Sequence, residues 1–210
     1  MTRKRILCFG DSNTWGYVPG MNGVPRYDED TRWTSLLQKK LNDTYEIIEF
    51  GLCGCTSGFA YEVHGVDTNG RDLYPSILFA HLPVDIVLIM LGTNDLKIQN
   101  NWQPGDTAKN LDALISITRG LAPGTKIILA PATILRKGFE SDPELDPATA
   151  IESSRLCAKE VAELAKQRDT LFFDTNQFVH ELAFDGCHFS AAAHKAFAEG
   201  LADFLTTEKP

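Results

Sequence analysis

Five short apolar segments, rich in β-branched residues, recur along the chain and predict β-strands. They cover residues 6–9, 45–50, 86–91, 126–131 and 171–174. Three of them are almost continuously apolar and lack the alternation of polar and apolar positions that marks a half-buried strand. Such runs are typical of parallel strands whose two faces are both covered by helices. The pattern therefore predicts a parallel sheet between helical layers.

Segments with helical periodicity lie between these strands and after the last one. They cover residues 31–41, 111–118, 148–167 and 190–205. The first follows acidic residues, which suit a helix N-terminus, and the last begins at Ser190, a residue type preferred as an N-cap. Strands and helices alternate throughout, without repeats or low-complexity tracts. We therefore expect an α/β protein of the doubly wound sandwich class, with one domain over residues 1–210.

Two long segments interrupt this rhythm. Residues 17–30 and 136–147 each contain several glycines or prolines, so both are predicted to be loops. Each loop leaves the C-terminal end of a strand or begins next to it, so we expect both to border one mouth. The second loop is equally compatible with a plain surface connection.

Length, composition and charge restrict the class of partner. The chain has 210 residues, of which 43% are hydrophobic, as is typical of a folded, soluble protein. Its net charge is −8 and its pI is near 5.1, which argues against nucleic-acid binding, because that function favours clustered lysine and arginine. We therefore expect a small-molecule substrate and no nucleic-acid partner, and the formation of a homo-oligomer is left open.

The N-terminus and the cysteines bear on the cellular compartment. The basic start is followed only by the short apolar segment 6–9, which is far too short for the core of a signal peptide, and no apolar run approaches a membrane span. The five cysteines are odd in number and irregularly spaced, so they predict no disulfide framework. A reducing cytoplasm without membrane association is therefore expected.

A metal site is not expected from the remaining ligand-type residues. Cys53 and Cys55 form a Cys-x-Cys pair, but no second pair stands at the spacing of a zinc site. The histidines away from the chemistry described below show no ligand spacing with each other or with cysteine; they are His64, His81, His180 and His194. We expect no metal and no other cofactor.

The most informative residues are polar or small ones just past the predicted strands. Ser12 follows the first strand in Gly-Asp-Ser, Gly54 follows the second, and Asn94 follows the third in Gly-Thr-Asn-Asp. Asp185 and His188 stand close together near the C-terminus. Since ligands bind at the carboxyl ends of parallel strands, these residues are expected to meet at one edge of the sheet.

This set supplies each part of an acyl-transfer site. A serine hydroxyl is a weak nucleophile until a base removes its proton, and His188 can act as that base. Asp185 can hold the other ring nitrogen. The backbone N–H groups of Ser12 and Gly54 and the amide of Asn94 can donate to an oxyanion. Singly, each residue has an ordinary alternative as a helix cap, a turn or a structural histidine; jointly they predict a serine ester hydrolase.

Four blocks of the chain resemble those of the SGNH (GDSL-type) hydrolases. The blocks are Gly10-Asp11-Ser12, Gly54, Gly92-Thr93-Asn94-Asp95 and Asp185-x-x-His188. The resemblance implies a three-layer α/β/α fold with a five-stranded parallel sheet, flavodoxin-like in character. It also implies Ser12 as nucleophile, Asp185 and His188 as the other triad members, and Ser12, Gly54 and Asn94 as oxyanion donors.

Other residues resemble the bacterial arylesterase/acyltransferase branch of that family. They are residues 4–19, Arg32-Trp33-Thr34 and His81-Leu82-Pro83. The branch hydrolyses small esters such as aryl acetates, and some members pass the acyl group to alcohols. This chain departs from the family at Asn13, where the family name has leucine, and from the branch at Cys53 and Cys55. We expect substrate contacts from four residues near the nucleophile: Asp11, Asn13, Trp15 and Tyr17.

Other functions compete with this hypothesis. Carbohydrate O-deacetylation, thioester hydrolysis and acyl transfer would use the same residues. A non-catalytic module of this fold could bind a sugar or a nucleotide, but the segment after the first strand lacks a phosphate-binding glycine fingerprint. The Gly-x-Ser-x-Gly elbow of α/β-hydrolases is also absent, because residue 14 is Thr. The leading hypothesis is a cofactor-free serine esterase that cleaves acetyl-type esters through an acyl-enzyme.

Overall fold

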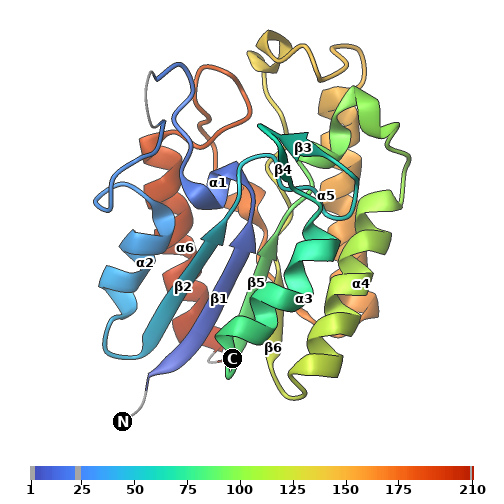
Figure 1. Cartoon of the computed structure of the whole chain (residues 1–210). Helices are drawn as coiled ribbons and strands as arrows, with labels where there is room; N and C mark the ends of the chain where they lie inside the picture. The colour runs from blue at the N-terminus through green and yellow to red at the C-terminus, as the bar shows by residue number, and fades with distance from the viewer. Residues whose placement is uncertain (1–2, 22–24, 209) are drawn as a thin grey trace.

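A parallel sheet of five strands forms the centre of the molecule, of which the computed structural model describes residues 3–21, 25–208 and 210. The strands are β1 (Lys4–Gly10), β2 (Tyr45–Gly51), β5 (Ile86–Met90), β6 (Lys126–Leu129) and β7 (Leu171–Phe172). They lie in the order β2-β1-β5-β6-β7, and all neighbours are parallel (Figure 1). All five predicted strands are confirmed, with boundaries that differ by no more than two residues.

Helices cover both faces of this sheet. One face carries α2 (Trp33–Leu41) and α6 (Ala191–Glu208), and the other carries α3 (Gly70–His81), α4 (Asp106–Leu121) and α5 (Ala150–Gln167) (Figure 1). The expected three-layer α/β/α fold is therefore confirmed. Within the described part of the chain, no helix has both the length and the apolar character needed to cross a membrane.

Four of the five helices correspond to predicted segments. α6 begins where it was predicted, because the Ser190 hydroxyl accepts the N–H of Ala193 at 3.1 Å. α2 begins at Trp33, two residues later than predicted, and its N-cap has no side-chain hydrogen bond. α3 was not predicted; it contains Pro75, and an interior proline ordinarily argues against a helix.

Alternate residues of the central strands face opposite helical layers. In β1, Ile6 and Cys8 pack with residues of α2 and α6, whereas Leu7 and Phe9 pack with residues of α3, α4 and α5. All four side chains are at most 1% exposed. A strand that is buried on both faces must be apolar at every position, which accounts for the continuous apolar runs in the sequence.

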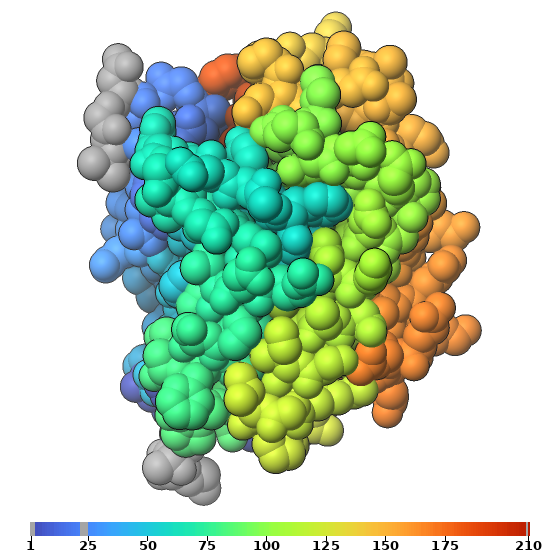
Figure 2. Space-filling view, turned by 45° about the vertical axis from the view of Figure 1, so that its right-hand side comes forward, coloured from blue at the N-terminus to red at the C-terminus, as the bar shows by residue number. Residues whose placement is uncertain are grey.

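Smaller elements occupy the carboxyl ends of the strands. α1 (Ser12–Trp15) follows β1, and an antiparallel pair, β3 (Glu62–Val63) and β4 (Val66–Asp67), lies between β2 and α3. Figure 2 shows the segment that contains this pair above α3. Short 3-10 helices lie at Asn94–Leu96, Ile98–Asn100, Phe139–Ser141 and Thr175–Gln177.

The order in which the chain adds strands to the sheet reverses between β1 and β5. β1 and β5 are neighbours, but the chain passes from β1 to α2 on one face and from β5 to α4 on the other. In open α/β sheets, ligands bind outside the carboxyl ends of the strands at such a reversal. The loops that follow the strands gather at this end, at the top of Figure 1.

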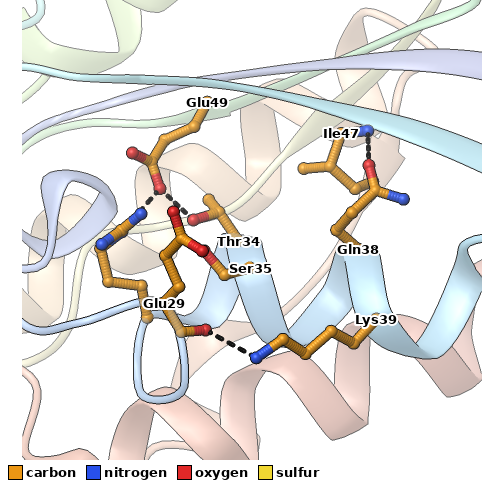
Figure 3. Close-up of a pocket in the computed structure, with 8 residues that line it drawn as sticks. Glu29, Thr34, Ser35, Gln38, Lys39, Ile47 and Glu49 are labelled. Carbon is orange, nitrogen blue, oxygen red and sulfur yellow. Dashed lines mark hydrogen bonds and ion pairs between the residues drawn. The ribbon is translucent and has the colours of Figure 1, made fainter.

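A cavity of about 250 Å³, lined mainly by polar and charged residues, lies between α2 and the edge strand β2 (Figure 3). Glu49 of β2 lines this cavity and accepts hydrogen bonds from the side chains of Arg26, Arg32 and Thr34. Gln38 of α2 points to the same strand, where its side chain accepts the N–H of Ile47 at 2.8 Å. Glu49 therefore ties both α2 and the loop after α1 to the sheet.

Replacing Glu49 is expected to destabilise the fold. Glu49→Ala leaves two half-buried guanidinium groups without a carboxylate, so the free energy of unfolding should fall by about 2–4 kcal/mol. Glu46→Ala, on the same strand, removes only the more exposed ion pair with Arg5 and should cost less than about 1 kcal/mol. Urea denaturation of both variants measures the difference, and equal losses would contradict the anchoring role of Glu49.

Candidate active site

Ser12 is held at the carboxyl end of β1 by a short helix. Asp11 is the N-cap of α1, and its carboxylate accepts the N–H of Asn13 at 2.9 Å. The helix ends at Gly16, whose φ of 88° favours glycine. Ser12 is thus the first residue of α1 and is only 7% exposed. Its backbone N–H lies at a helix N-terminus, where negative charge is favoured.

His188 and Asp185 lie beside this serine. Nε2 of His188 is 3.0 Å from Oγ of Ser12, and Nδ1 of the same ring is 2.6 Å from Oδ2 of Asp185. Partial burial acts to raise the pKa of Asp185, but hydrogen bonds from His188 and from backbone N–H groups outweigh it and hold the pKa below its usual value. The carboxylate is therefore charged at neutral pH and can stabilise an imidazolium.

A tight turn carries both of these residues. The other oxygen of Asp185, Oδ1, accepts the backbone N–H groups of Cys187 and His188 at 3.2 and 3.0 Å. Gly186 has a φ of 60°, and a Cβ atom there would lie 2.1 Å from the carbonyl oxygen of Arg136. One carboxylate therefore both shapes the turn and orients the imidazole.

Gly54 and Asn94 come from neighbouring loops. The amide of Asn94 donates one hydrogen bond to the carbonyl of Cys55 at 3.0 Å, so its second N–H remains for another acceptor. Gly54 has a φ of 80°, and a Cβ atom there would lie 2.4 Å from Val63. The loop of Gly54 is joined to the end of β1, because the N–H of Leu52 donates to the carbonyl of Gly10 at 3.1 Å.

A buried carboxylate, Asp95, links the same two loops. Its oxygens accept the backbone N–H and the hydroxyl of Ser57 at 2.7 and 2.5 Å, and the hydroxyl of Thr107 at 2.6 Å. Burial raises the pKa of Asp95 to about 6, although these hydrogen bonds oppose the shift. No role for Asp95 was predicted from the sequence, where its place beside Asn94 in the Gly-Thr-Asn-Asp block was the only signal.

The four residues expected to contact substrate have different surroundings. Asp11 is 2% exposed and Asn13 is 3% exposed, and both side chains form hydrogen bonds with the protein itself. The ring of Trp15 lies under the guanidinium of Arg26, 4.9 Å from its centre. Tyr17 packs its ring against that of His188, with 4.6 Å between centroids. Of the four side chains, that of Tyr17 is the one whose ring contacts the ring of the candidate base, His188.

Both predicted loops reach the turn of Asp185 and His188. Phe184, which is 72% exposed, packs against Gly20 of the loop at 17–30. From the loop at 136–147, the N–H of Arg136 donates to the carbonyl of Gly186 at 2.9 Å. Both loops therefore contact the turn of Asp185 and His188, and their bordering of one substrate mouth stays a prediction.

The remaining candidate ligands form no metal centre in the residues the structure describes. All five cysteines are free, and burial raises the pKa of the Cys53 thiol to about 11. His194 is fully buried, and burial lowers its pKa to about 3, so it stays neutral.

The chain is similar over almost its whole length to proteins of known structure. The model of the GDSL-like lipase/acylhydrolase family matches residues 8–196. None of the curated proteins matches the chain. A solved structure of the native aryl esterase of M. smegmatis is similar, with a TM-score of 0.87, 32% identity, and coverage of 97% of this chain and 99% of that one.

Two structures from Sinorhizobium meliloti are also similar. One is a carbohydrate acetylesterase family member, with a TM-score of 0.89, 30% identity, and coverage of 97% of this chain and 98% of that one. The other is Est24, a carbohydrate acetylesterase, with a TM-score of 0.87, 28% identity, and coverage of 98% of this chain and all (100%) of that one.

Asp95→Asn is expected to change how stability depends on pH. A carboxyl group whose pKa rises from 3.8 to about 6 on folding favours the folded state fully below pH 3.8 and loses that contribution as the pH rises through about 6. Two pKa units correspond to at most about 3 kcal/mol. Urea denaturation should therefore find Asp95→Asn more stable relative to wild type at about pH 7 than at about pH 4. A pH-independent difference would contradict the raised pKa.

Proposed function

Because the chain belongs to the GDSL-like lipase/acylhydrolase family and is a serine esterase, we propose that it cleaves small, acetyl-type carboxylic esters through an acyl-enzyme formed on Ser12. The observation that carries the proposal is the aligned series of Ser12, His188 and Asp185, with contacts of 3.0 and 2.6 Å. No metal or organic cofactor is needed for this chemistry.

In the first half of the reaction, Oγ of Ser12 attacks the ester carbonyl carbon while Nε2 of His188 takes the hydroxyl proton. The imidazolium is stabilised by Asp185 through Nδ1. His188 then gives the proton to the departing alcohol as the tetrahedral intermediate collapses to the acyl-enzyme. In the second half, His188 takes a proton from water as the water oxygen attacks the acyl carbon. His188 then returns the proton to Oγ of Ser12 as the bond between Oγ and the acyl carbon breaks and the carboxylic acid is released.

The negative charge that develops on the carbonyl oxygen requires fixed donors. We assign this role to the backbone N–H groups of Ser12 and Gly54 and to the free amide N–H of Asn94. The hydrogen bond from Asn94 to Cys55 supports the assignment, because it holds the Asn94 amide beside the loop that contains Gly54. Donors that are already in place need no reorganisation when the charge appears.

The substrate class follows from the similar proteins and from the position of the site. Structures at 30–32% identity are described as an aryl esterase and as a carbohydrate acetylesterase family member; both are esterases, and the second description names acetyl as the acyl group. Tyr17 packs beside His188, which protonates the leaving alcohol, so an aromatic ring lies on the alcohol side of the site. Within this proposal, transfer of the acyl group to an alcohol would follow the same steps, with the alcohol in place of water.

The proposal also covers the domain organisation, the cellular compartment and the partners of the protein. We treat residues 1–210 as one catalytic domain, because the candidate residues come from both ends of the chain. The free cysteines suit a reducing cytoplasm. A homo-oligomer stays open, and the negative net charge of −8 disfavours nucleic acid as a partner.

Ser12→Ala should abolish turnover of 4-nitrophenyl acetate, because the variant lacks the attacking oxygen. The release of 4-nitrophenol is followed for acetate and for longer acyl esters, and wild-type activity should fall as the acyl chain lengthens. Ser116→Ala, which changes an exposed serine on α4, serves as the matched control and should keep full activity. Retained turnover in Ser12→Ala would refute the assigned nucleophile.

Asn94→Ala should lower kcat by about 10²–10³, because one donor to the oxyanion is lost. KM should change little, since the charge on the oxygen is largest in the transition state. Steady-state kinetics with 4-nitrophenyl acetate gives both constants. A rise in KM at unchanged kcat would instead place Asn94 in ground-state binding.

A further inference from the structure

Asn13, the residue after Ser12, joins the candidate nucleophile to the turn that carries His188. Its Oδ1 accepts the N–H of Phe189 at 2.8 Å, and its Nδ2 donates to the carbonyl of Cys187 at 3.4 Å. These peptide groups lie directly after and directly before His188. One side chain therefore holds the backbone of the base on both sides.

The position of Asn13 is itself closely determined. Its N–H donates to the carboxylate of Asp11 at 2.9 Å, and its carbonyl accepts the indole N–H of Trp33 at 3.1 Å. Trp33 is fully buried and Asn13 is 3% exposed. The side chain of Asn13 therefore extends from a fixed helix, α1, to the turn.

In the described part of the chain, no second side chain makes such a link. Among the hydrogen bonds of the described residues, Asn13 provides the only side-chain bonds to the backbone of residues 187–189 that come from outside the turn. The carboxylate of Asp185 binds the same backbone, but it belongs to the turn and moves with it. The distance between the turn and α1 therefore depends on Asn13 and on the packing around it.

We propose that Asn13 is a positioning residue, which keeps His188 within reach of Ser12 and acts on proton transfer through the imidazole. This inference rests on the proposed function. Asn13 is 3% exposed and both polar atoms of its amide bond to the turn, which distinguishes this role from the substrate contact expected from the sequence. Leucine, which the family name has at this position, can form neither of the two hydrogen bonds.

Asn13→Leu should reduce kcat for 4-nitrophenyl acetate by roughly 10- to 100-fold, because a misplacement of about 1 Å can cost a factor of that order. KM should stay within about two-fold of wild type, since no substrate contact is lost. Asn13→Ala is the second variant, in case leucine does not fit the site. Circular dichroism and the Tm of each variant confirm that it is folded at the assay temperature.

Asn176→Leu is the matched control. The Asn176 side chain forms the same pair of bonds, accepting the N–H of Ile134 at 2.9 Å and donating to the carbonyl of Ala132 at 3.4 Å. Its loss should lower the Tm to a similar extent as the loss of Asn13 while kcat stays near the wild-type value. A similar fall of kcat in both variants would show a general effect of lost stability and would overturn the proposal.

A double-mutant cycle with His188→Ala tests the route of the effect. If Asn13 acts only through the imidazole, Asn13→Leu should change the residual kcat of His188→Ala by no more than about two-fold. The rate measured with Ser12→Ala is subtracted from each residual rate as the background. A further 10- to 100-fold loss in the His188→Ala background would overturn the proposal.

Two other results would also overturn it. Unchanged kcat in Asn13→Leu would show that the turn is held without the amide, and a higher KM at unchanged kcat would make Asn13 a substrate contact. Failure of the proposed function looks different, because wild type itself would then show no turnover that depends on Ser12.

Discussion

The contact of 3.0 Å between Oγ of Ser12 and Nε2 of His188 is the constraint on which the arrangement of this site depends. The two residues are 176 positions apart, so only the completed sheet can bring them together. β1 delivers the serine to the carboxyl edge, and the turn that carries the histidine returns to this edge after the last strand. Because all five strands of the central sheet are parallel, the loops that leave their carboxyl ends meet on one side.

Three buried or half-buried carboxylates then hold this edge together. Asp11 caps the helix of the nucleophile, Asp185 shapes the turn of the base, and Asp95 joins the loops of Gly54 and Asn94. A buried carboxylate is unfavourable unless its oxygens are bonded, and burial raises the pKa of both Asp11 and Asp95 to about 6. These groups lie where the proposed reaction needs fixed donors and a fixed base, so their energetic cost is consistent with preorganisation.

The sequence predicted the layers well because two-sided burial leaves a simple pattern. The run at 86–91 could be interpreted without the structure, since every position of β5 is buried. Helices α3 and α1 were missed: α3 has a proline, Pro75, in its interior, and the four residues of α1 are too few to show a periodicity. The candidate nucleophile, base and donors could be identified from their chemistry. The links made by Asn13 and Asp95 could not, because each joins loops that are distant in sequence, and no local pattern encodes such a contact.

The most direct test of the account is to identify the residue that carries the covalent intermediate. Purified protein is treated with diethyl 4-nitrophenyl phosphate, which phosphorylates an activated serine, and the digested protein is analysed by mass spectrometry. The account predicts one label per chain, located on Ser12, together with complete loss of esterase activity and no label in Ser12→Ala. Inactivation with the label on another residue, or full activity after complete labelling of Ser12, would contradict it.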